Sequence, residues 1–133
     1  MSNTAYYEGL PIYRAALDTT VAVHKAVATF SKLHKYALGA QLQRQSIEIV
    51  ELVAASNRKE DRVATLPQLC RAAENLKILV NLGKELEAFA SFGQYAQIAQ
   101  RVVDLARQAQ AWRRHSASGA RPERPAVLRK EVQ

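Results

Sequence analysis

Apolar residues recur at steps of three and four along most of this chain of 133 residues. That spacing places them on one side of an α-helix, and it repeats in four stretches separated by short polar links. Only 7% of the residues are aromatic, and alanine and leucine dominate the apolar ones, which favours helices over sheets. The pattern therefore predicts an all-α fold, an up-down-up-down four-helix bundle with helices of about 20 residues.

The first two helices are expected over residues 11–31 and 36–56, joined by a short link at residues 32–35. Pro11 suits a first helical turn, where the missing N–H has no helical partner. The predicted inward stripe of the first helix is Tyr13, Leu17, Thr20, His24, Val27 and Phe30, and that of the second is Leu38, Leu42, Ile49, Leu52 and Val53.

The third helix begins between residues 60 and 67, and the residues alone leave two starts open. Thr65 and Gln68 have the spacing of a capping box, whereas an earlier start places Pro67 inside the first turns. Ser91 and Gln94 form a second candidate capping box, which starts the fourth helix. The predicted inward residues are Leu69, Ala73, Leu76, Val80 and Leu86 on the third helix, and Phe92, Tyr95, Ile98, Val102, Leu105 and Trp112 on the fourth.

The residues that carry most enzyme chemistry are sparse and scattered. His24, His34 and His115 lie far apart, and no Glu-x-x-His pair of the kind that binds two metal ions in helical bundles is present. Cys70 is the only cysteine, and a buried, unreactive thiol is the favoured interpretation. No glycine-rich phosphate loop occurs. We therefore expect no enzyme activity and no cofactor.

A single cysteine also excludes an intramolecular disulfide and a thiolate zinc cluster, which fits a reducing cytoplasm. No apolar run approaches the roughly 20 residues of a membrane span, and the N-terminal residues lack the pattern of a secretory signal. We expect a cytoplasmic protein without a membrane partner.

The net charge of +7 favours a polyanion partner such as RNA or DNA, although an ordinary basic protein has a similar balance. At 100° per residue, basic residues fall into rows on the predicted helices, and such rows can follow phosphates without reading bases. The candidate nucleic-acid-binding residues are Arg14, Lys25 and Lys32 on the first helix, Arg44 and Arg58 on the second, and Lys77 and Lys84 on the third. The alternative is a solvated outer face with scattered charge pairs.

Two glycines fall inside predicted helices, where each costs about 1 kcal/mol relative to alanine. Close approach of another helix to Gly39 and Gly83, from the same chain or from another subunit, offsets that cost. Ile47, Val50 and Ile78 lie off the main stripes and are surplus apolar positions that a subunit contact would use.

Five short segments, in order, carry a resemblance to a known family. They are HKYALGAQL at residues 34–42, NRKEDR at 57–62, ENLKILV at 74–80, FASF at 89–92 and QAW at 110–112. The chain resembles the accessory variability determinant of diversity-generating retroelements over about residues 10–115. It is more loosely similar to a wider group of four-helix bundles that includes proteins encoded in 23S ribosomal RNA intervening sequences.

The resemblance implies a bundle that assembles as a pentameric barrel, binds nucleic acid and associates with the reverse transcriptase of the element. It also favours the earlier start of the third helix. The expected organisation is an N-terminal extension at residues 1–10, the bundle at 11–115 and a disordered basic tail at 116–133. Two alternatives stay open: a bundle that binds structured RNA without a reverse transcriptase, and a helical adaptor that binds only proteins.

Overall fold

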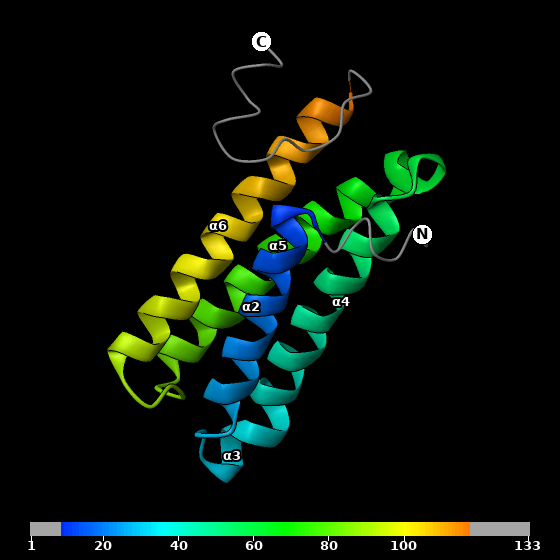
Figure 1. Cartoon of the computed structure of the whole chain (residues 1–133). Helices are drawn as coiled ribbons and strands as arrows, with labels where there is room; N and C mark the ends of the chain where they lie inside the picture. The colour runs from blue at the N-terminus through cyan, green and yellow to red at the C-terminus, as the bar shows by residue number, and fades with distance from the viewer. Residues whose placement is uncertain (1–8, 118–133) are drawn as a thin grey trace.

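Four long helices pack side by side in the computed structural model, which describes residues 9–117 (Figure 1). They are α2 (Pro11–Val27), α4 (Ala40–Ser56), α5 (Arg62–Glu85) and α6 (Phe92–Ser116). Successive helices run in opposite directions, and each packs on the next. α2 also packs on α6, which closes the bundle and leaves α2 and α5 diagonally opposite. The prediction of an all-α four-helix bundle is confirmed.

α2 begins at Pro11 as predicted, but its innermost face is displaced from the predicted stripe. Tyr13, Leu17, Thr20 and His24 are only half-buried. Because α2 lies between α4 and α6, the residues that face the bundle axis are mostly those one position earlier in the chain, and several are small. The buried residues of α2 are Ile12, Ala16, Thr19, Val23, Ala26 and Val27.

The connection between the first two long helices was wrongly placed. α2 ends at Val27, and the chain turns over residues 28–31, where Thr29 Oγ1 donates to the carbonyl of Ala26 at 2.6 Å. A new helical segment then begins with α3 (Lys32–His34) and continues through a π-helical turn, η1 (Lys35–Gly39), into α4. The predicted link at residues 32–35 is therefore helical. Thr29 and Phe30 continued the apolar pattern of the first helix, which hid the turn from periodicity.

Both helical glycines allow close packing within this one chain. A Cβ at Gly39 would lie 2.7 Å from Val27 Cγ1, and a Cβ at Gly83 would lie 2.7 Å from Phe89 Cε2. Such distances are shorter than side-chain contacts allow. The close approach predicted for the two glycines is thus intramolecular, and neither glycine argues for a subunit interface.

The junction of α4 and α5 is held by a buried arginine. After the short 3₁₀ turn η2 (Lys59–Asp61), α5 begins at Arg62, so the earlier of the two predicted starts is correct and Pro67 lies inside the helix. Arg62 Nε donates to Ser56 O at 2.9 Å, and Nη2 donates to Asn57 O at 2.8 Å. These two bonds satisfy carbonyls at the end of α4 that lack helical donors.

The capping box at the start of α6 is confirmed at its first bond. Ser91 Oγ accepts the backbone N–H of Gln94 at 3.1 Å, and Gln94 Oε1 accepts the N–H of Ala90 at 2.9 Å.

Two of the predicted inward residues near the α5–α6 connection are wrong. Phe92 is 70% exposed because it is the first residue of the helix, and Leu86 is 45% exposed because it follows the last residue of α5.

The core runs the length of the bundle and contains most of the other predicted inward residues. Its largest fully buried side chain is Trp112, and Leu69, Leu76 and Leu105 are completely inaccessible to solvent. The core also includes Leu10, so burial begins before the first helical residue, and α6 extends to Ser116. Residues 1–8 and most of the predicted tail, residues 118–133, lie outside the described part.

Within residues 9–117, no helix combines the length and the hydropathy that a membrane crossing requires.

Candidate nucleic-acid interface

The structure distributes the seven predicted basic residues over α2, α3, α4, α5 and the connection between α4 and α5. Arg14 and Lys25 lie on α2, Arg44 on α4, and Lys77 and Lys84 on α5, as predicted. The other two are not on the helices assigned to them. Lys32 is the first residue of α3, beyond the turn that ends α2. Arg58 lies after α4, so the predicted rows that included Lys32 and Arg58 are wrong.

Several of these cations have partners close by. Arg14 pairs with Asp18 at 3.8 Å, Arg58 with Asp61 at 2.8 Å, and Lys77 with Glu74 at 3.3 Å. Exposed ion pairs stabilise a fold little, but each carboxylate offsets the field that its cation presents to a distant polyanion.

The two remaining cations on α4 and α5, Arg44 and Lys84, also have other groups close to them. Lys84 Nζ lies 5.5 Å from the ring centroid of Tyr95, a cation–π contact. Arg44 lines a groove between α2 and α4 together with Glu48 and Glu51. Two carboxylates beside one guanidinium make that groove a poor site for phosphate.

A different groove, between α2 and α6, brings two cations together. It has a volume of about 360 Å³, and Lys25 from α2 and Arg101 from α6 both line it. Both side chains are exposed, and neither has an ion-pair partner among residues 9–117. Asp18 is the one carboxylate on the groove wall, and it pairs with Arg14.

Sequence reasoning missed Arg101. Its position relative to Lys25 depends on how α6 packs against α2, and these residues are 76 positions apart. The sequence indicated only that Arg101 lies on the outer face of the fourth helix, and many other surface residues lie on such a face.

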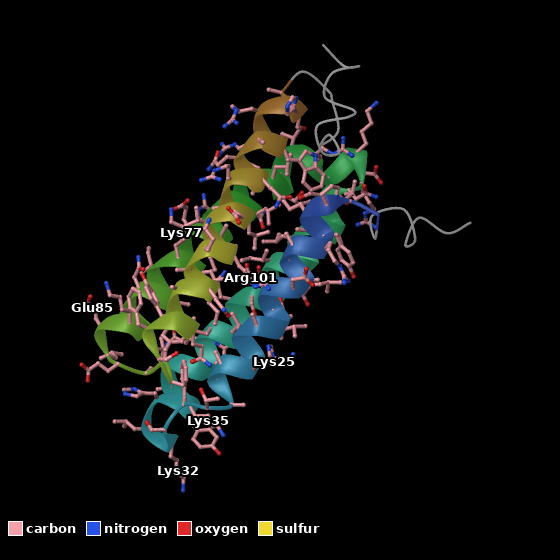
Figure 2. All side chains as sticks on the ribbon, turned by 60° about the vertical axis from the view of Figure 1, so that its left-hand side comes forward. Lys25, Lys32, Lys35, Lys77, Glu85 and Arg101 are labelled. Carbon is pink, nitrogen blue, oxygen red and sulfur yellow. The ribbon has the colours of Figure 1, made fainter. Side chains whose placement is uncertain are left out.

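Figure 2 extends this pair of cations toward one end of the bundle. In that view Arg101, Lys25, Lys35 and Lys32 follow one another from the middle of the molecule to the end where α3 lies, whereas Lys77 and Glu85 lie on the α5 side. Lys35 belongs to η1, directly after α3. We call Arg101, Lys25, Lys35 and Lys32 the basic track.

The described part of the chain contains no group of three or more His, Cys, Asp or Glu side chains placed to bind a metal ion. His24 is half-buried, and its Nδ1 lies 3.0 Å from Thr20 O. Cys70 is buried, and burial raises the pKa of its thiol, although a hydrogen bond and the charge of Arg113 act in the opposite direction. A raised pKa keeps the thiol protonated and a weak nucleophile.

Exposed apolar side chains form a second kind of surface. Two of the predicted surplus positions are indeed open to solvent, Ile78 at 63% and Ile47 at 43%, whereas Val50 is half-buried against the core. Leu82, one helical turn beyond Ile78 on α5, is 45% exposed. These side chains are available for contact with another protein chain.

Comparisons with known proteins do not assign this chain to a family: no family model, no curated protein and no solved structure matches it.

Proposed function

We propose that this protein is a non-catalytic accessory protein of a diversity-generating retroelement. It binds nucleic acid, RNA or its DNA copy, and the reverse transcriptase of the element. In this role it supports copying of a template-repeat RNA with errors at adenines. The polymerase chemistry belongs to the reverse transcriptase, and this chain supplies a scaffold and positive charge.

The observation that carries the nucleic-acid part of the proposal is the set of unpaired cations on the bundle. Residues 118–133 contribute only two of the seven net positive charges, so most of the excess belongs to the folded part. At the groove between α2 and α6, Lys25 and Arg101 have no carboxylate partner within residues 9–117. A cation without a carboxylate partner can neutralise a phosphate fully, and this releases the counterions that were condensed on the nucleic acid.

The retroelement part of the proposal is supported by the resemblance of the five sequence segments and by the bundle architecture that the resemblance implies. The proposed pentamer has the exposed Ile47, Ile78 and Leu82 as candidate contact residues. A ring would place several basic tracks on one particle, and a polynucleotide that reaches several of them binds more tightly through effective concentration.

Assembly and partnership are tested on the full chain. Light scattering should give about five times the chain mass of 14.8 kDa, and a monomer at micromolar concentration would refute the pentamer. Co-expression with the reverse transcriptase encoded beside the gene should yield a stable complex. If no reverse transcriptase gene with paired repeats lies nearby while RNA still binds, the structured-RNA alternative replaces the retroelement role.

A further inference from the structure

We infer that the basic track is the path of a single-stranded polynucleotide, held at the groove between α2 and α6 by Lys25 and Arg101. This inference rests on the proposed nucleic-acid function and goes further, because it names the face of the bundle and the form of the ligand. It also moves the interface away from Lys77 and Lys84, which lie on α5, the helix diagonally opposite α2.

The lining of the groove suits a nucleotide as well as its phosphate. Gln94 and Gln97 of α6 line it beside the two cations. Because Gln94 Oε1 already accepts the N–H of Ala90, the amide nitrogen of Gln94 remains as a donor. Val21, 51% exposed, adds an apolar surface to the same wall. The cations can contact a phosphate, the amides can hydrogen-bond a base edge, and the apolar wall can pack on a sugar.

The size of the groove favours one strand over two. Its volume of about 360 Å³ is at the lower end of the range that proteins offer to small molecules. A single strand can place one nucleotide inside it and continue along the track. A double helix presents its phosphates on a convex cylinder, so it reaches the rim and leaves Gln94 and Gln97 unused.

An exposed aromatic residue lies at the far end of the track. Tyr36 follows Lys35 in η1 and is 71% exposed. Surfaces that bind single strands without sequence preference combine a basic groove with aromatic rings on which unpaired bases stack. A duplex has no unpaired base to offer, so Tyr36 distinguishes the two ligands.

The test uses the full chain and fluorescence anisotropy with two labelled probes, an oligouridine of about 16 nucleotides and an RNA duplex of the same length. The groove variant is K25Q/R101Q, and the matched control is K77Q/K84Q, which removes the same charge from α5. Circular dichroism and light scattering must show wild-type fold and mass for both variants.

Loss of two phosphate contacts should weaken single-strand binding about 25-fold at about 0.1 M salt and lower the log–log salt slope by about 1.4. The control variant should change affinity less than about threefold, and duplex binding should depend less on the groove. Tyr36→Ala should weaken oligouridine binding at least about fivefold and leave duplex binding unchanged.

Equal losses in K25Q/R101Q and K77Q/K84Q would overturn the inference, since only net charge would then matter. Displacement of the RNA by oligoglutamate of equal charge and at equal concentration would also overturn it, because the groove would then be a general anion site. If wild type binds no RNA at low salt, the proposed function fails as well. Crosslinking of 4-thiouridine RNA to wild-type protein gives a check independent of variant folding: adducts should map to α2, η1 and α6, and adducts confined to α5 would contradict the path.

Discussion

Replacement of Arg62 by methionine should destabilise the bundle strongly, although Arg62 has no ion pair with a carboxylate among residues 9–117. The side chain is 7% exposed, and it donates two hydrogen bonds to backbone carbonyls of Ser56 and Asn57. Its guanidinium carbon also lies 5.9 Å from the ring centroid of Trp112. Methionine retains similar length and apolar bulk but has no donor.

The magnitude follows from these contacts. A hydrogen bond from a charged donor contributes about 1.5–3 kcal/mol, and a cation–π contact contributes about 0.5–2 kcal/mol. Part of this sum is offset, because methionine is less costly to bury than an unpaired guanidinium. We expect a net loss of about 2–4 kcal/mol in the free energy of unfolding, which lowers Tm by roughly 8–16 °C in a domain of this size.

Urea denaturation at fixed protein concentration measures this loss. Arg71→Met is the matched control, because Arg71 is an exposed arginine on the same helix, and it should change the free energy of unfolding by less than about 0.5 kcal/mol. Arg62→Lys should fall between the two, because an ammonium cannot place two donors in the fork geometry of arginine. If Arg62→Met loses no more stability than Arg71→Met, the account of the α4–α5 junction is wrong.

Three further predictions concern local features of the bundle. Gly83→Ala should lower the free energy of unfolding by about 1–2 kcal/mol, although alanine has the better helix propensity. The new Cβ meets the ring of Phe89, which packs with its centroid 5.3 Å from that of Phe30. A gain of stability in urea denaturation would show that the Phe89 ring moves freely. Ser91→Ala should cost about 1 kcal/mol by the same assay through loss of the helix cap, whereas Ser91→Asp should retain most of the stability. Cys70 should react with iodoacetamide far more slowly in the folded protein than in urea at the same pH, since burial raises its pKa; equal rates would contradict its burial.

Helical periodicity was sufficient to predict the number, order and approximate span of the long helices. Pro11 and the pair Ser91 and Gln94 fitted their predicted positions because these signals are local: a fixed backbone angle or a bond between neighbours in sequence. The residues alone left the start of α5 open, and only the resemblance favoured the earlier start that places Pro67 inside the helix. The turn after Val27 was missed because Thr29 and Phe30 continue the apolar pattern while the backbone leaves the helix. The apolar pattern shows which positions are apolar but not the backbone conformation between them. Phe30 is buried in the turn, so it extends the pattern as a residue inside the helix would.

The candidate interface was less accessible from sequence, for a different physical reason. A phase along one helix predicts which residues share a face, but an anion site between helices depends on packing. Lys25 and Arg101 meet only because α2 and α6 close the bundle. Conversely, the sequence showed Glu74 near Lys77 but not the contact between Lys84 and Tyr95, which connects two helices.

The burial of Arg62 also had no sequence signal. Lysine and arginine are almost never fully buried unless they are paired. Here the partners are backbone carbonyls, and any sequence provides those. Only the positions of the α4 end and the α5 start show that a guanidinium fits between them.

The central claim, that this bundle binds nucleic acid through phosphate contacts, is tested most directly by the salt dependence of RNA binding to the wild-type full chain. Anisotropy titrations of oligouridine and of a mixed-sequence RNA between about 50 and 200 mM salt give the log–log slope. We predict a negative slope of about −1.4 or steeper, if Lys25 and Arg101 each neutralise one phosphate. The affinities for the two RNA sequences should be similar. Absence of binding at the lowest salt, or binding whose affinity does not change with salt, would contradict the account.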